Sequence, residues 1–185
     1  MASHRTFSLG RRKPLGGPDL GLCEGIVSDR ILSALYDSAS QLHRMEIRFV
    51  AIGGLAVGAY GAPRATTAVD FLVGAEAYEH HGPIVSFRRG LPISVGGVNV
   101  DPVSLGENEV FLADAFEHPT YSNGVPVIAL EALIYIKLAA GRRQDLADVA
   151  RLLASGIDER PVRRYLSDHA SELLPLLERC AEERP

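Results

Sequence analysis

The segment from residue 50 to residue 73 constrains the fold more than any other feature, because a short β-rich run ends there in two adjacent glycines. Gly53 and Gly54 follow residues 48–52, and residues 55–60 after them have the composition of a short helix. Backbone N–H groups at a glycine pair can approach a phosphate closely, because no Cβ atom obstructs them and a helix N-terminus adds partial positive charge. A tight turn that requires unusual φ angles is the other interpretation, and the glycines alone leave both open.

Hydrophobic patterning on either side of the glycine pair predicts an α+β domain. Apolar residues at helical spacing predict a helix over residues 28–43, and residues 69–73 predict a second strand. A second glycine pair between the β-rich runs 91–95 and 98–103 indicates a hairpin, and its second arm carries Asp101. The chain beyond residue 108 is expected to be helical, and helices are predicted at residues 75–80, 129–140, 144–153, 158–165 and 171–180.

The chain divides into three predicted parts. Residues 1–25 mix Ser, Arg, Gly and Pro without apolar periodicity, which is typical of a flexible tail. Residues 26–125 contain the predicted strands and the Gly53-Gly54 pair, and they are expected to form a compact mixed α/β core. Residues 126–185 are expected to form a helical region packed on that core.

Composition limits the class of partner and the compartment. The 185 residues are 46% hydrophobic with a formal net charge of −4, which is typical of a soluble globular protein and not of a non-specific nucleic-acid binder. Cys23 and Cys180 are far apart and form no C-x-x-C motif, so a thiolate zinc site is not expected. No apolar stretch approaches the length of a membrane span, and we expect a cytoplasmic protein without a membrane partner.

Two aspartates occupy positions at which neighbouring strands bring carboxylates together. Residues i and i+2 of a strand face the same side, so positions 68 and 70 are expected to point into one site. Asp70 occupies the second of these positions, and Asp101 on a neighbouring strand can supply a further carboxylate. Carboxylate oxygens on adjacent strands are the ligands that hard divalent cations such as Mg²⁺ prefer. These aspartates are therefore candidate ligands of Mg²⁺.

The same segment resembles the nucleotidyltransferase superfamily, in which a glycine pair precedes two acidic residues that flank one hydrophobic residue on a strand. More narrowly, it is similar to the AbiEii-type and related small nucleotidyltransferases of bacterial toxin–antitoxin and abortive-infection systems. Together the similar segments span roughly residues 48–153. The residues that carry the similarity are Gly53-Gly54, Arg64-Ala65-Thr66, Asp70-Phe71-Leu72-Val73, Lys137-Leu138-Ala139-Ala140-Gly141-Arg142-Arg143 and Asp145-Leu146-Ala147-Asp148.

The resemblance implies a nucleotidyltransferase-like (polymerase beta-like) core with a short mixed sheet and a C-terminal helical layer. It implies Mg²⁺-dependent transfer of a nucleotidyl group from an NTP to an acceptor hydroxyl of an unknown protein, RNA or small molecule, with a cognate antitoxin as a candidate partner. By the same resemblance, Asp70 and Asp101 are the catalytic and metal-binding residues, with Asp101 as general base or ligand. The implied nucleotide-binding residues are Gly53, Gly54, Arg64, Thr66 and Lys137.

The chain departs from the family pattern at Ala68, where the first metal-binding carboxylate is expected. Thr66 lies on the same face but offers only a weak, neutral ligand. We therefore expect turnover on the order of 10²- to 10⁴-fold lower than with a complete set of ligands. Natural loss of catalysis and deliberate replacement by alanine both fit this residue. The alternative to an impaired enzyme is an inactive nucleotidyltransferase-fold protein that acts as a binding or regulatory partner, for instance in a toxin–antitoxin pair.

Four charged residues of the similar segments have roles that the sequence leaves open. Arg64 holds triphosphate, orients Asp70, or forms a salt bridge that braces its loop. Lys137 lies on an apolar helix face and either reaches a phosphate or pairs with a buried carboxylate. Asp145 and Asp148 are one turn apart, and we expect them to cap their helix and to pair with neighbouring arginines.

Overall fold

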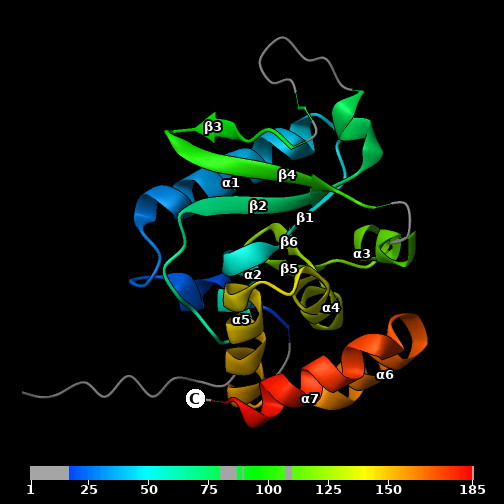
Figure 1. Cartoon of the computed structure of the whole chain (residues 1–185). Helices are drawn as coiled ribbons and strands as arrows, with labels where there is room; N and C mark the ends of the chain where they lie inside the picture. Colours follow the sequence, from blue (N-terminus) through cyan, green and yellow to red (C-terminus); the bar gives the residue numbers. More distant parts are fainter. Residues whose placement is uncertain (1–16, 80–86, 89, 107–109, 185) are drawn as a thin grey trace, which may run out of the picture.

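The strands form one mixed sheet, with helices packed against it (Figure 1). The computed structural model describes residues 17–79, 87–88, 90–106 and 110–184. The order of the strands in the sheet is β3-β4-β2-β1-β6-β5, which gives the α+β class with a short mixed sheet that the sequence predicts. The strands are β1 (Phe49–Ala51), β2 (Ala68–Val73), β3 (Ile93–Val95), β4 (Val98–Ser104), β5 (Thr120–Ser122) and β6 (Val125–Val127).

Strand β2 determines which side chains share a face at the centre of the sheet. It pairs parallel with β4 along its whole length. It also pairs antiparallel with β1, over residues 71–73. Val69, Phe71 and Val73 are buried on one face, and the Phe71 ring packs edge-to-face on a neighbouring phenylalanine of β1. Because strand residues alternate between faces, Ala68 and Asp70 point to the opposite side of the sheet.

Helices lie on both sides of the sheet in Figure 1, with α1 on one side and α5, α6 and α7 on the other. α1 contacts β2, β3 and β4, whereas α2 packs against β2, and α4 contacts both α5 and α6. The helices are α1 (Asp29–Arg44), α2 (Gly53–Ala59), α3 (Asp114–Glu117), α4 (Leu130–Ala140), α5 (Arg143–Ala154), α6 (Glu159–His169) and α7 (Leu174–Glu182). Short 3₁₀ turns are η1 (Leu20–Cys23), η2 (Ala75–Tyr78), η3 (Val110–Ala113) and η4 (Ser171–Leu173).

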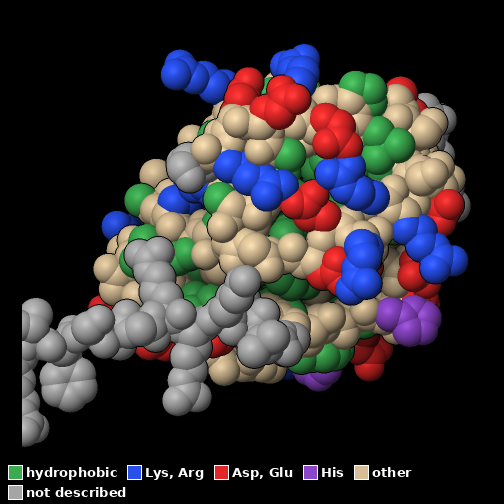
Figure 2. All heavy atoms as spheres, turned by 90° about the horizontal axis from the view of Figure 1, so that it is seen from below, with side chains coloured by type: hydrophobic (Ala, Val, Ile, Leu, Met, Phe, Trp, Pro, Cys, Tyr) green, Lys and Arg blue, Asp and Glu red, His purple; other side chains and the backbone are tan. Residues whose placement is uncertain are grey.

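The C-terminal helices present a surface of mixed charge. Ion pairs join Arg163 of α6 to Glu159 of the same helix and to Glu178 of α7. Figure 2, a view from below Figure 1, shows Lys and Arg side chains interspersed with Asp and Glu across this face. Such a surface differs from the continuous basic area that non-specific nucleic-acid binding requires. Within the part of the chain that the structure describes, no helix has the length and apolarity needed to cross a bilayer.

Most of the predicted elements are confirmed. The helix predicted over residues 28–43 is α1, and the hairpin with Asp101 in its second arm is formed by β3 and β4. α4 ends before Gly141, whose φ of 63° is the left-handed conformation that terminates many helices. The short helix predicted at residues 75–80 is the turn η2, and residue 80 lies outside the described residues.

The prediction of a helical chain beyond residue 108 is wrong between residues 120 and 127. Strands β5 and β6 form a hairpin there, with Asn123 and Gly124 in the turn at φ angles of 50° and 79°. Each strand has three residues, which is too short for hydrophobic alternation to register in the sequence. β6 pairs with β1, so the core sheet extends beyond the expected boundary at residue 126.

Residues 17–25 are packed on the core, although the sequence predicts a flexible tail up to residue 25. Leu20 and Cys23 are buried in the turn η1. The backbone N–H of Leu20 donates to Ser122 Oγ at 2.8 Å, and that of Asp19 donates to the Ala59 carbonyl at 2.9 Å. A single 3₁₀ turn is too short to show a periodic pattern, which is why the composition dominates the prediction. Residues 1–16 lie outside the described residues.

Candidate active site

Asp70 on β2 and Asp101 on β4 lie opposite each other, because the two strands are parallel and in register at this position. Both side chains are half-buried. Neither carboxylate makes a hydrogen bond or an ion pair with another described residue. Burial and the neighbouring negative charge of Asp101 raise the pKa of Asp70. Two unpaired carboxylates in this arrangement repel each other, so a cation between them is favoured.

Gly53 brings the backbone at the start of α2 into contact with Asp70. Its φ of 65° lies in the left-handed region that favours glycine, which agrees with the turn interpretation of the glycine pair. A Cβ atom at this position would lie 1.9 Å from Asp70 Oδ2 and 2.7 Å from its Cγ. A side chain at residue 53 is therefore incompatible with the observed position of the carboxylate.

Gly53→Ala is expected to displace the Asp70 side chain and to abolish Mg²⁺ binding at this pair. Left-handed backbone alone costs alanine about 1–2 kcal/mol, and the collision adds to that cost. The matched control is Gly25→Ala, because Gly25 has a φ of 73° and no atom lies within 4 Å of an added Cβ. Urea unfolding and Mg²⁺ calorimetry should show a stability loss in both variants but a loss of binding only in the first. Retention of Mg²⁺ binding by Gly53→Ala would contradict the close contact.

Three further sequence-predicted residues gather next to the glycine pair. A Cβ atom at Gly54 would lie 3.0 Å from Thr66 Oγ1 and 3.4 Å from Arg64 Nη1. Thr66 Oγ1 donates to the backbone carbonyl of Ala68 at 3.3 Å, so the segment leading into β2 lies along the start of α2. The structure thus brings Gly54, Arg64 and Thr66 to the same place as Gly53 and Asp70.

Ala68 occupies the position at which a third carboxylate would join Asp70 and Asp101. It begins β2, is half-buried, and lies two residues before Asp70 on the same strand face. Among the described residues, no group of three or more His, Cys, Asp or Glu side chains is arranged to hold a metal ion. In general, two carboxylates can hold one divalent cation together with other oxygen ligands, whereas a pair of metal ions requires more carboxylates.

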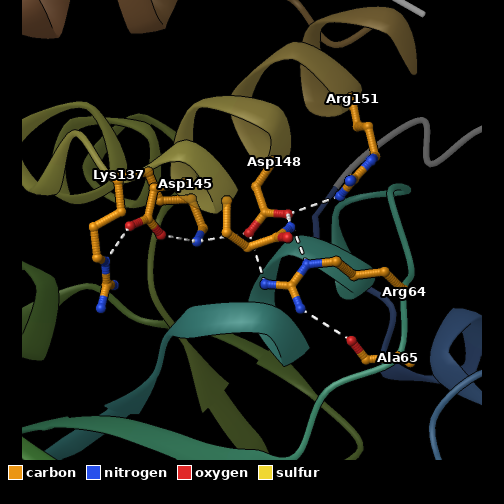
Figure 3. Close-up of polar contacts among 8 residues, drawn as sticks. Arg64, Ala65, Lys137, Asp145, Asp148 and Arg151 are labelled. Atoms are coloured by element: carbon orange, nitrogen blue, oxygen red, sulfur yellow. Dashed lines mark hydrogen bonds and ion pairs between the residues drawn. The ribbon is translucent and has the colours of Figure 1, made fainter.

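A buried network of charges lies behind the glycine pair and joins α4, α5 and the segment before β2 (Figure 3). Lys137 Nζ on α4 lies 2.8 Å from both Asp145 Oδ1 and Asp148 Oδ2 on α5. Arg64 donates to the Asp148 carboxylate through Nε and Nη2, at 2.7 and 2.8 Å, and Arg151 contacts it at 2.9 Å. In the structure, Lys137 and Arg64 pair with carboxylates, and their contact with phosphate stays a prediction.

The network keeps its buried carboxylates ionised. The side chain of Asp148 has no exposed surface, and burial acts to raise its pKa. Hydrogen bonds from Arg64 and Lys137 outweigh burial and lower the pKa of Asp148 to about 2. Burial likewise opposes ionisation of Asp145, whereas hydrogen bonds from Arg142 and Lys137 lower its pKa. Asp145 and Asp148 are therefore structural anions, in contrast to the unpaired aspartates of β2 and β4.

Arg142 is a site residue that the sequence analysis does not single out. It lies in the two-residue connection between α4 and α5, and its Nε donates to Asp145 Oδ2 at 2.5 Å. This contact, with that of Arg151 to Asp148, confirms the expected pairing of the α5 aspartates with neighbouring arginines. The expectation that these aspartates cap the helix is wrong, because the N-cap residue of α5 is Arg142 and it forms no side-chain cap hydrogen bond. Burial and the charge of Asp101 raise the pKa of Asp70, whereas the charges of Lys137, Arg142 and Arg64 act to lower it. The sequence offers adjacent arginines at 142 and 143 without indicating which one faces the aspartates.

A pocket of about 280 Å³ continues the carboxylate-bearing face of the sheet towards α4. Leu72 and Val103 line it, and each lies two residues beyond Asp70 or Asp101 on the same strand face. A larger hollow of about 680 Å³ lies between α1 and the β5–β6 hairpin, and it contains none of the sequence-predicted site residues. We place the candidate site at the smaller pocket because its strand residues Leu72 and Val103 lie on the same strand faces as the two unpaired carboxylates. Its other lining residues are Ile52, Ser104, Leu112, Ile136, Ala139 and Ala140.

Comparison with known proteins supports the fold. The chain is similar to the crystal structure of an antigenic nucleotidyltransferase-like protein from Paracoccidioides brasiliensis, with a TM-score of 0.53. The similarity covers 86% of this chain and 91% of that chain at 16% sequence identity, so it concerns the fold alone. No protein-family model and no curated protein matches the chain. The chain therefore has a nucleotidyltransferase-like α+β fold.

Proposed function

We propose that the chain is a Mg²⁺-dependent nucleotidyltransferase, impaired by Ala68, that acts on an NTP and an acceptor hydroxyl. The in-register pair of Asp70 and Asp101 carries this proposal, because neither carboxylate forms an ion pair with a described cation. Gly53 lies directly against Asp70 of this pair. Unpaired carboxylates beside a glycine pair at the start of a helix are suited to Mg²⁺ and nucleotide phosphates. The nucleotidyltransferase-like fold supports the same reading, and the AbiEii-type and toxin–antitoxin setting follows from the sequence resemblance.

The proposed reaction assigns each residue of the site a task. Gly53 and Gly54 offer backbone N–H groups to the phosphates, and Asp70 and Asp101 would hold Mg²⁺. The metal ion supplies neutralisation of phosphate charge. Asp101 accepts the proton of the acceptor hydroxyl as general base, the hydroxyl oxygen forms a bond to the α-phosphorus, and the bond to pyrophosphate breaks. Lys137 adds positive potential from behind the phosphates.

The segment between α2 and β2 supports the phosphate-binding backbone in this proposal. Thr66 contacts Gly54 and the carbonyl of Ala68, so it fixes the start of β2 relative to the start of α2. Arg64 is held by Asp148 and lies against Gly54, and its charge acts on Asp70. We propose that Arg64 and Thr66 hold the geometry of the site on the triphosphate side.

We propose that the 280 Å³ pocket takes the base of the nucleotide. Two residues of a strand span about 7 Å, which leaves room for a sugar between the base beside Leu72 and Val103 and the phosphate at the aspartates. The lining is apolar except for Ser104, and apolar pockets discriminate weakly between ligands of similar size. Weak selectivity among NTPs is the expected consequence.

Asp70→Asn and Asp101→Asn are each expected to weaken Mg²⁺–NTP binding by about tenfold or more, because each removes a charged ligand. The matched control is Asp37→Asn, which removes the same charge from an exposed position on α1 and should change the affinity by less than about twofold. The measurement is calorimetry with each of the four NTPs and Mg²⁺. Failure of the native chain to bind any NTP, or equal weakening in all three variants, would contradict the proposed function.

A further inference from the structure

We propose that Arg142, rather than Lys137 or Arg64, contacts the phosphate chain of the nucleotide directly. The inference rests on the proposed function, since it names the phosphate contact of the same site. Three cations of the buried network are candidates for this contact, namely Lys137, Arg142 and Arg64. The network reaches the glycine pair, because Arg64 Nη1 lies 3.4 Å from a Cβ atom placed at Gly54. The three cations differ in burial and in how many of their donors are already used.

Lys137 and Arg64 are committed to carboxylates within the protein. The Lys137 side chain is 5% exposed, and its ammonium group is shared between Asp145 and Asp148 at 2.8 Å each. Arg64 donates to Asp148 through Nε and Nη2, and its Nη1 donates to the Ala65 carbonyl at 3.0 Å. A phosphate would have to displace these contacts and leave a buried carboxylate unpaired, which is costly.

Arg142 has free donors in a fixed orientation. Its side chain is 78% exposed, and within the described residues it makes a hydrogen bond only through Nε, to Asp145 Oδ2. The other oxygen of Asp145 is held by Lys137, so the carboxylate that anchors the guanidinium is itself fixed. The two terminal nitrogens of Arg142 remain available, and a guanidinium fork binds phosphate oxygens in a bidentate manner.

The local charge balance also favours an anion at Arg142. Arg64, Lys137, Arg142 and Arg151 surround the two carboxylates of Asp145 and Asp148, which leaves positive charge in excess. Three of these cations, Lys137, Arg142 and Arg64, also act to lower the pKa of Asp70. A triphosphate bound with Mg²⁺ would lie between the metal ligands and the exposed guanidinium.

The neighbouring Arg143 provides a matched control. It carries the same charge on the next residue, but it lines a pocket with Ala150 and Glu183 on the side of α5 towards the C-terminus. Arg142 is bound to Asp145 of the buried network, whereas Arg143 forms no ion pair with another described residue. Removing either arginine changes the net charge equally, so only a local contact distinguishes the two variants.

The test is calorimetry with inorganic tripolyphosphate and Mg²⁺, a probe that needs no base. Arg142→Gln is expected to lower the affinity about 10- to 100-fold, because a hydrogen-bonded contact between charged groups is lost. Arg143→Gln should lower it by less than about threefold, a surface-charge effect. Arg142→Lys keeps the charge but loses the fork, so an intermediate affinity is expected.

The failure of this inference differs from failure of the proposed function. Suppose that the native chain binds Mg²⁺–NTP through Asp70 and Asp101. Equal tripolyphosphate affinities of Arg142→Gln and Arg143→Gln would then overturn only the role of Arg142. Failure of the native chain to bind either Mg²⁺–NTP or tripolyphosphate would overturn both. If the glutamine variant unfolds at a lower urea concentration than the native chain, the comparison of Arg142→Lys with Arg143→Lys decides, and equal affinities there overturn the inference.

Discussion

Ala68→Asp is expected to raise Mg²⁺-dependent nucleotidyl transfer by about 10²- to 10⁴-fold, because it supplies a carboxylate on the strand face that already carries Asp70. Position 68 lies opposite Asn99, which is two residues before Asp101 on the same face of β4, so the new carboxylate would be diagonal to Asp101. Three carboxylates permit the two-metal arrangement that two carboxylates do not. The measurement is transfer of label from α-labelled NTP to an acceptor in the presence of Mg²⁺.

The control for added charge is Thr67→Asp. Thr67 is exposed and precedes Ala68, so an aspartate there adds the same charge at the neighbouring position but points away from the site. We expect no rise in transfer with this variant. A similar rise in both variants would mean that negative charge in general, and not a metal ligand, limits the reaction.

No transfer by Ala68→Asp, combined with intact Mg²⁺–NTP binding, would contradict the proposed impaired enzyme. That combination would favour the alternative reading, in which a nucleotidyltransferase-like fold binds nucleotide as a regulatory partner. The impaired enzyme and the regulatory partner are therefore distinguished by nucleotidyl transfer in Ala68→Asp. Nucleotide binding by the native chain does not distinguish them.

Asp148→Asn is expected to destabilise the fold by about 3–5 kcal/mol, the largest stability effect of any substitution considered for this chain. The variant removes the charge that pairs with Arg64, Lys137 and Arg151 and leaves those cations partly uncompensated in a buried place. The measurement is urea unfolding at neutral pH. Asp168→Asn, which removes an exposed partner of Arg164, should cost less than about 1 kcal/mol. A loss below 1 kcal/mol for Asp148→Asn would contradict the importance of the network.

The same network predicts how stability depends on acid pH. The pKa of Asp148 is lowered in the folded chain to about 2, so its contribution is fully present above the ordinary aspartate pKa of about 4. That contribution decreases as the pH falls from about 4 towards 2, because the unfolded chain binds the proton first. The free energy of unfolding of Asp148→Asn should therefore fall less steeply over this interval than that of the native chain. Parallel pH profiles would contradict the assignment.

The central architecture could be predicted from the sequence because its signals are long or chemically specific. The 16-residue helix α1 and the strand with Asp70 show their periods clearly, and the turn before β4 is marked by a glycine pair. The three-residue strands β5 and β6 and the single turn η1 were not predictable in this way, because so few residues cannot display a period.

The site was predictable in its residue types and less so in its pairings. The positions of Asp70 and Asp101 follow from strand alternation and a parallel register, which the structure has. The choice between phosphate and carboxylate partners for Lys137 depends on how α4 packs on α5, and sequence spacing does not encode that packing angle. For the same reason the sequence could not distinguish Arg142, which pairs with Asp145, from its neighbour at residue 143.

The most direct test of the central claim is a crystal structure of the native chain with Mn²⁺ and a non-transferable NTP analogue, read by anomalous scattering. We expect a Mn²⁺ peak at Asp70 and Asp101, phosphates between the Gly53 backbone and Arg142, and the base in the pocket beside Leu72. Nucleotide bound in the larger hollow near α1, or Mn²⁺ absent from the two aspartates while nucleotide is bound elsewhere, would contradict it.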